Sequence, residues 1–172
     1  PFKNDVLGVM AALVQVDPQY VVALETALGA GAQNVVVRTA EAAKQAIAYL
    51  KNNSGGRVTF LPLDTLQARS LSSEEQKLSQ LPGVVGFASN LVRCAAAVQP
   101  AVQFLLSRVL VAENLDVALQ AARQCRFRLR VVTLAGDVVN AGGSMTGGSR
   151  QQKDVGYLSR QKAIQEIKQQ LE

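Results

Sequence analysis

The residue types that most often carry out catalysis are sparse in this sequence. Histidine is absent, which excludes Ser-His-Asp and Cys-His catalysis and removes the commonest zinc ligand. The two cysteines, Cys94 and Cys125, lie far apart and outside any C-x-x-C pair. We therefore expect reduced thiols in a cytoplasmic protein rather than a disulfide, and a non-enzymatic domain without metal or other cofactor.

Two carboxylates stand where α/β enzymes often place catalytic groups. Asp64 and Asp137 each follow a predicted strand, at residues 58–61 and 130–134, and the carboxyl ends of strands are the usual location of such sites. A pair of catalytic acids is one interpretation. The simpler one, which we favour, is that each aspartate caps the turn after its strand.

The sequence also lacks the usual nucleotide-binding loops. Gly29-Ala30-Gly31 is a G-x-G motif, but it follows a predicted helix and precedes a strand, and Asn34 stands where a third glycine belongs. A dinucleotide site needs the opposite order of elements. No G-x-x-x-x-G-K-[ST] motif occurs, so we expect no P-loop.

The most unusual segment is glycine-rich and follows the last predicted strand. Glycine is used where backbone turns tightly or approaches another surface closely. A flexible linker, a nest of N–H groups for phosphate, and a short exposed strand that extends a partner's sheet are all possible interpretations. Its place between a strand and a terminal helix argues against a linker. The candidate interface residues are Gly142, Gly143, Ser144, Met145, Thr146, Gly147 and Gly148.

The net charge of +5 arises in the last part of the chain, from Arg123 onward. A local basic excess favours polyanionic partners. Three of these arginines alternate, so in a strand they would project from one face; ordinary solvated charge is the alternative. The candidate DNA-binding residues are Arg126, Arg128, Arg130, Arg150, Lys153, Arg160 and Lys162. Phosphate contacts would show little sequence preference and weaken with salt.

The elements that position these residues repeat. In the first half, Asp17-Pro18 opens a helix, a strand follows at 35–37, Thr39 caps a helix over 40–50, and a strand covers 58–61. The second half has a helix from residue 99, a strand at 109–111, a helix over 115–124 capped by Asn114, and a strand at 130–134. Strand–helix–strand units place their strands in parallel, which predicts two α/β lobes with approximate twofold symmetry; chance similarity is the alternative.

The remaining segments connect or flank these lobes. Residues 69–80 are polar, with a helix start at Ser72, and we expect a variable surface insert there, then a strand near 86–88 and a helix near 91–92. Residues 157–171 have a narrow apolar seam, typical of a coiled coil or of an amphipathic helix packed on the core. No apolar run is long enough to span a membrane. The first residue is Pro1 rather than Met and no basic-then-apolar leader follows it, so we expect a fragment of a longer chain with no signal peptide in view.

Three motifs together resemble the hinge domain of bacterial structural maintenance of chromosomes (SMC) proteins. They are G-R-V-T-F-L-P-L-D at 56–64, V-T-L-A-G-D at 132–137 and G-G-S-M-T-G-G at 142–148. The resemblance covers nearly the whole chain and is weak only at 67–80. It implies an α/β (α+β) fold of two pseudo-symmetric subdomains, 17–82 and 83–150, with a coiled-coil lead-in at 1–16 and a coiled-coil exit helix at 151–172.

The same resemblance implies a function. It implies a ring-like dimer, a homodimer in bacterial and archaeal members, in which the glycine segment lies at the contact, with one lobe facing the opposite lobe of the partner. Such hinges join coiled-coil arms, contact DNA without sequence specificity, and serve chromosome condensation and segregation at the cytoplasmic nucleoid, while remote ATPase heads act elsewhere in the chain. The alternative is a self-standing nucleic-acid-binding α/β domain whose glycine segment is a phosphate loop.

Overall fold

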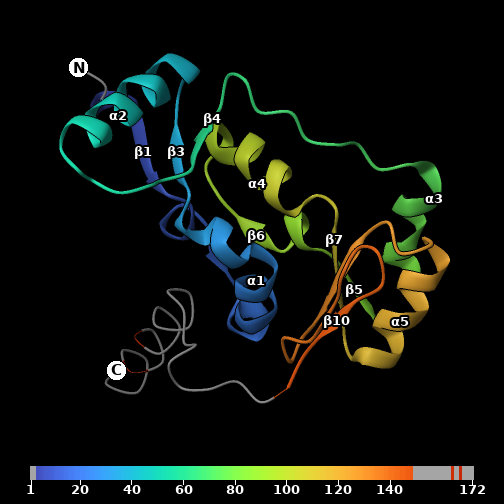
Figure 1. The fold of residues 1–172 in the computed structure, drawn as a ribbon. Helices are drawn as coiled ribbons and strands as arrows, with labels where there is room; N and C mark the ends of the chain where they lie inside the picture. Colours follow the sequence, from blue (N-terminus) through green and yellow to red (C-terminus); the bar gives the residue numbers. More distant parts are fainter. Residues whose placement is uncertain (1–2, 149–163, 165–166, 168–172) are drawn as a thin grey trace.

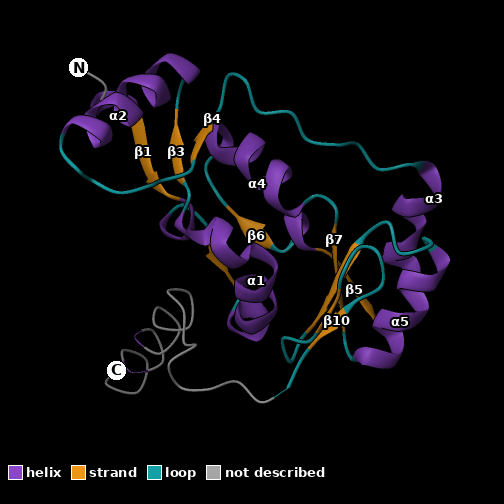
Figure 2. Cartoon of the chain, viewed as in Figure 1, coloured by secondary structure: helices purple, strands orange, loops and turns teal. Residues whose placement is uncertain are grey.

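The computed structural model describes residues 3–148 together with Ile164 and Ile167. Within these residues the strands form a three-stranded, a five-stranded and a two-stranded sheet (Figures 1 and 2). The first has the order β1-β3-β4 and the second β10-β9-β8-β7-β5. The strands are β1 Val6–Val9, β2 Gln15–Val16, β3 Val35–Val37, β4 Phe60–Pro62, β5 Val84–Phe87, β6 Val92–Arg93, β7 Val109–Ala112, β8 Arg130–Thr133, β9 Val138–Val139 and β10 Met145–Thr146.

Helices pack on these sheets. The α-helices are α1 Val21–Leu28, α2 Ala40–Asn52, α3 Ser73–Gln76, α4 Gln99–Leu106 and α5 Leu115–Gln124. Short 3-10 turns occupy Lys3–Asp5, Met10–Ala12, Pro18–Tyr20, Gly29–Gln33, Lys77–Gln80, Ala88–Asn90 and Ala96–Val98. None of the helices in the described residues is long and apolar enough to cross a bilayer.

The predicted strand–helix–strand units are confirmed in both halves. Parallel strands β3 and β4 are connected through α2, and parallel strands β7 and β8 through α5. We call residues 6–64 the first lobe and residues 84–148 the second lobe. Both predicted N-caps are present: the Thr39 hydroxyl and the Asn114 amide oxygen each accept a backbone N–H, at 3.0 Å. Such caps stabilise a helix by about 1 kcal/mol.

The repeat is longer than the sequence suggested, and residues 1–16 are not a coiled-coil lead-in throughout. β1 pairs antiparallel with β3 and β5 pairs antiparallel with β7, each with an irregular register at a glycine. Gly8 and Gly86 both have positive φ, at 138° and 150°. The expected helix near 91–92 is also wrong, because a 3-10 turn at Ala88–Asn90 leads directly into β6.

The two lobes meet at a short antiparallel pair. β2 pairs with β6, with Gln15 opposite Arg93 and Val16 opposite Val92. These strands occupy equivalent places after β1 and after β5, so an approximate twofold axis passes between them. Across the axis, the Arg93 guanidinium contacts the Asp17 carboxylate at 2.8 Å. Asp17 thus makes this ion pair and no side-chain bond to the turn that leads into α1.

The largest apolar core is shared between the lobes. It contains Met10 and Leu24 from the first lobe together with Val102, Leu106 and Val111 from the second, all fully buried. A second cluster lies between α5 and the five-stranded sheet, and a much smaller one lies under α2. Burying apolar side chains supplies most of the folding free energy, so each lobe depends on the other for its stability.

The polar segment between the lobes is anchored rather than loose. Ser72 and Glu75 form a reciprocal capping box at the start of α3. The buried Glu75 carboxylate also accepts from Arg108, at 3.3 Å to Nη1 and 3.0 Å to Nη2. Burial by itself raises the pKa of Glu75, but the Ser72 N–H and the Arg108 guanidinium outweigh it and hold this pKa below its ordinary value. Most of the segment is exposed, as expected of a surface insert, and the buried Glu75 and Leu78 anchor it.

Replacing Arg108 with methionine leaves the Glu75 carboxylate buried without its partner. We expect a loss of about 2 kcal/mol of unfolding free energy at pH 7, because an unpaired charge keeps its desolvation cost. Since the folded-state pKa of Glu75 is depressed, its charged form stabilises the wild-type fold at neutral pH and ceases to do so as pH falls through that pKa.

Urea denaturation at pH 7 and pH 3 measures this difference. The gap between wild type and Arg108→Met should narrow at pH 3, and the Glu75→Gln/Arg108→Met double variant should recover part of the loss at pH 7. An unchanged gap at the two pH values would contradict the assignment.

Candidate functional site

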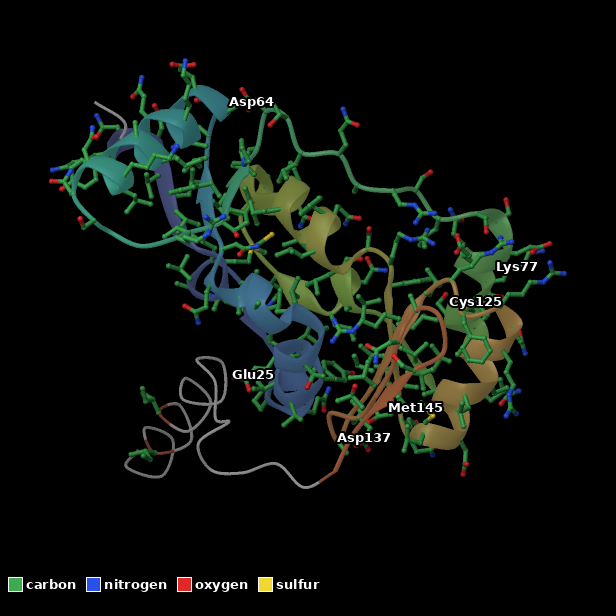
Figure 3. The ribbon with its side chains drawn as sticks, in the orientation of Figure 1. Glu25, Asp64, Lys77, Cys125, Asp137 and Met145 are labelled. Atoms are coloured by element: carbon green, nitrogen blue, oxygen red, sulfur yellow. The ribbon has the colours of Figure 1, made fainter. Side chains whose placement is uncertain are left out.

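The glycine segment forms the edge of the five-stranded sheet. β10 pairs antiparallel with β9, with Met145 opposite Val139 and Thr146 opposite Val138, and it is the last strand in the sheet order. In the described part of the chain, its other edge has no strand partner. The segment therefore contains an exposed strand, which is the interpretation that the sequence favoured over a linker (Figure 3).

The backbone of this segment needs its glycines. Gly142, Gly143 and Gly148 have φ values of +92°, +106° and +125°, a region that side chains disfavour. The Gly142 N–H donates to the Phe127 carbonyl at 2.8 Å. A Cβ on Gly147 would lie 2.5 Å from the Asp137 carboxylate oxygen. The glycines thus form a tight hairpin that presents β10.

The hairpin's hydrogen bonds show which groups of β10 face outward. The Asn140 N–H donates to the Ser144 carbonyl at 2.7 Å, so this carbonyl points toward β9. Backbone groups of successive strand residues point to opposite edges. The N–H and C=O of Met145 therefore face the open edge, and its side chain is 50% exposed. An edge with unpaired backbone groups is a template for strand addition.

Asp137 closes the other side of the hairpin. Its carboxylate accepts the Gly148 N–H at 3.4 Å, so a negative charge lies beside the glycine backbone. This charge disfavours a phosphate nest in the same place. The Asp137 carboxylate therefore binds the glycine segment rather than capping the turn after its own strand, which was the expected role.

Asp64 binds a different part of the fold from Asp137. It accepts the Ala40 N–H at 2.9 Å and so caps the start of α2 from a distance of 24 residues along the chain. Asp64 and Asp137 lie well apart, in different lobes, as Figure 3 shows. The paired-acid interpretation is therefore wrong. No group of three or more metal-ligating side chains is present among residues 3–148.

The alternating arginines are not on one strand. Arg126 and Phe127 are left-handed, with φ of 57° and 59°, and they form the turn that ends α5. β8 begins only at Arg130, so the predicted alternation across a strand face is wrong. Arg126 and Arg128 are exposed and line a polar pocket with Ser72, Glu74, Glu75, Gln124 and Cys125.

Arg130 points into the protein instead. Its guanidinium donates to the Ala27 carbonyl at 2.9 Å and to the Thr26 carbonyl at 3.0 Å. Burial lowers the pKa of this side chain, and two carbonyls at the end of α1 compensate for the lost water. Arg130 therefore ties α1 to β8. Sequence spacing alone could not reveal this, because its partners lie in the other lobe.

The structure does not describe four of the candidate DNA-binding residues or most of the expected exit helix at 151–172. These four residues are Arg150, Lys153, Arg160 and Lys162. Ile164 and Ile167 of that segment are helical and more than half exposed. Both cysteines are free thiols, as expected; Cys125 is buried, and burial raises the pKa of Cys94.

Comparison with known proteins points in one direction. The family described as SMC proteins Flexible Hinge Domain matches residues 3–122. The chain is 43% identical over 169 residues to the chromosome partition protein Smc of Desulfitobacterium hafniense, covering 98% of this chain and 14% of that protein. The corresponding protein of Bacillus subtilis is 41% identical, over 93% of this chain and 14% of its own length. The chain thus spans a small part of these relatives.

Solved structures agree. An asymmetric dimer of the Geobacillus stearothermophilus SMC hinge domain gives a TM-score of 0.84 at 41% identity, over 96% of this chain and 67% of that one. The Pyrococcus furiosus SMC hinge domain gives a TM-score of 0.68 at 29% identity, over 88% of this chain and 81% of that one.

The structural task of Arg130 leads to a direct prediction. Arg130→Met removes two charged hydrogen bonds and leaves the end of α1 unsatisfied, so we expect a loss of about 2 kcal/mol of unfolding free energy. Arg128→Met, at the exposed turn, should change it by no more than about 0.5 kcal/mol. Urea denaturation of both variants measures the difference, and equal stabilities would refute the assignment.

Proposed function

Because this chain belongs to the family of flexible hinge domains of SMC proteins, we propose that it is the dimerisation hinge of a bacterial chromosome partition ATPase. As a hinge domain it is distinct from the ATPase head of such proteins. In the proposed role it pairs with a second copy of itself, joins the coiled-coil arms of the two chains and contacts DNA at the nucleoid in the cytoplasm. The observation that carries this proposal is the open edge of β10.

The two lobes differ in a way that suits mutual pairing. In the second lobe, β8 is followed outward by β9 and β10. In the first lobe, the equivalent strand β4 is the last strand of its sheet, and among the described residues nothing extends that edge. The surplus hairpin of one copy can therefore extend the first-lobe sheet of the other. Val58, just before β4, is 37% exposed and adds apolar surface there.

Such pairing occupies both the β10 edge and the β4 edge of each copy. A twofold operation that places the β9–β10 hairpin of one copy on β4 of its partner also makes the reciprocal contact. The β10 edge and the β4 edge of each copy are then both occupied in one closed ring, and further chains cannot add at these two edges. The bare backbone of Gly142 and Gly143 lets the two sheets approach closely.

A change at Met145 tests the edge directly. Met145→Pro removes the N–H that faces outward and leaves the bonds between β10 and β9 in place. We expect it to weaken the dimer at least tenfold, measured by light scattering after size-exclusion chromatography across micromolar concentrations. Met145→Leu, which keeps the backbone, is the control and should leave the dimer intact.

A second variant separates loss of pairing from loss of folding. Gly143→Val with Gly147→Val should also yield monomers, with circular dichroism reporting whether the lobes stay folded. A wild-type chain that is monomeric throughout this range, or a Met145→Pro chain that dimerises normally, would overturn the proposal.

DNA contact is the second element of the proposed function. The exposed side chains of Arg126 and Arg128 project from the turn after α5, and Arg150, Lys153, Arg160 and Lys162 supply more positive charge along the chain. Glu75 beside this turn is already paired with Arg108 and does not compete for the two arginines. Arg130, committed to α1, is left out of the DNA-binding set.

Salt dependence tests this contact. Arg126→Gln with Arg128→Gln should weaken binding to duplexes of unrelated sequence equally and should reduce the slope of log K against log salt by about 2, because each lost phosphate contact removes about 0.9. The control variant, Lys44→Gln with Lys51→Gln on α2, removes the same amount of charge elsewhere. Its slope of log K against log salt should stay closer to the wild-type slope than that of the arginine double variant. Equal effects of the two pairs would show that net charge alone acts.

A further inference from the structure

The chain passes from the first lobe to the second through an exposed strap. We give this name to Gln67, Ala68, Arg69 and Ser70, all of which are exposed and lie in no helix or strand. Figure 1 shows the chain there as an open green loop between β4 and α3. No backbone–backbone hydrogen bond joins the strap to another part of the chain that the structure describes. Exposed backbone of this kind is where proteases cut folded proteins.

The contacts that anchor the end of the strap lie on its second-lobe side. The Ser70 carbonyl accepts a hydrogen bond from the Arg108 guanidinium at 3.2 Å. Arg108 also forms the ion pair with Glu75, and Leu71 packs against the apolar cluster of α5. All these residues belong to the chain from Ser70 onward. A cut just before Ser70 therefore breaks none of these contacts.

The two lobes are joined by an extensive interface that the strap does not take part in. Fully buried side chains from both lobes, such as Leu24 and Val102, pack in the shared core. β2 of the first lobe pairs with β6 of the second. Gly31, just after α1, lies so close to α4 that a Cβ there would be 3.0 Å from the Leu105 Cδ2 atom. Apolar burial with close packing is also what holds separate chains together in stable complexes.

Polar contacts make this interface specific for one arrangement of the lobes. Arg130 comes from the second lobe, and the two carbonyls that accept its hydrogen bonds, those of Thr26 and Ala27, come from the first. A largely buried guanidinium needs acceptors at fixed positions to offset its lost water. The surface of each lobe therefore fits the other lobe and is not a general apolar face.

We propose that the two lobes recognise each other as partners without their covalent connection, so that a chain cut in the strap stays folded as a complex of residues 1–69 with residues 70–172. The strap then supplies only a high local concentration of one lobe beside the other. A short connection gives an effective concentration of about millimolar. Cutting it leaves the contacts between the lobes unchanged and makes the stability of the complex depend on protein concentration. This partnership lies within one chain and is separate from the proposed contact between copies.

A cut made in the folded protein tests the proposal. The recognition sequence of a site-specific protease is inserted between Arg69 and Ser70, both in the wild-type chain and in the Met145→Pro chain, and the purified proteins are cut. The second background is needed because the proposed dimer contact also joins a first lobe to a second lobe. We expect the two fragments to co-elute in size-exclusion chromatography at micromolar concentrations in both backgrounds, with the circular dichroism of the uncut protein. Fragments that separate or aggregate, or that co-elute only in the wild-type background, would overturn the proposal.

A change at Arg130 shows whether the fragments are held by the native interface. In the cut protein, Arg130→Met should raise the Kd of the two fragments at least about tenfold, measured by dilution, because two charged hydrogen bonds are lost. Arg128→Met, at an exposed position, is the matched control and should change the Kd by no more than about twofold. Equal effects of the two variants would contradict the proposal. Light scattering of the uncut chains reports on dimerisation before any cut is made, so a failure of the proposed hinge function is seen separately.

Discussion

Neither lobe of this protein can bury its apolar surface alone, and this constraint governs the rest of the structure. The central core takes Met10 and Leu24 from one lobe and Val102, Leu106 and Val111 from the other. The β2–β6 pair and the Arg130 bonds to the end of α1 hold the lobes in register. The free energy gained by burying apolar surface is roughly proportional to the area buried and is the main favourable term in folding. The lobes therefore form one rigid platform rather than two modules on a linker.

On this symmetric platform, the differences between the lobes carry the function. The second lobe has a feature that the first lacks within the described residues, the β9–β10 hairpin. Its absence from the first lobe leaves the β4 edge without a further strand. A sheet edge accepts a strand through main-chain bonds, so the β4 edge suits a strand from a partner.

The parts of the fold that depend on short-range chemistry could be predicted from the sequence. Thr39 and Asn114 cap their helices with their own side chains, and the valine-rich runs at β3 and β7 form strands because they are buried on both faces. β1 was missed, because four residues beside an expected coiled coil give a weak signal. Its likeness to β5 becomes evident only when V-L-G-V and V-V-G-F are seen to pair in the same way.

In the candidate site, too, the feature that depends on local sequence could be predicted and the features that depend on distant contacts could not. The glycine segment was found because glycine signals unusual backbone directly, and its strand is present. The arginines were misplaced because two left-handed residues end α5, and such turns depend on the packing of Phe127 and the Gly142 N–H bond to its carbonyl. The partners of Arg130 lie over 100 residues away in the sequence.

The number of basic residues in a segment therefore does not show which of its arginines can bind a phosphate group. The guanidinium groups of Arg108 and Arg130 donate hydrogen bonds to acceptors inside the protein. Moving a charge out of water costs free energy, and fixed acceptors are needed to offset that cost. Arg126 and Arg128 keep theirs in solvent, on a turn whose shape is set by the α5 terminus. The two arginines that are bonded inside the protein stabilise the contact between its parts, and only the two solvent-exposed arginines on the turn are available to bind a polyanion.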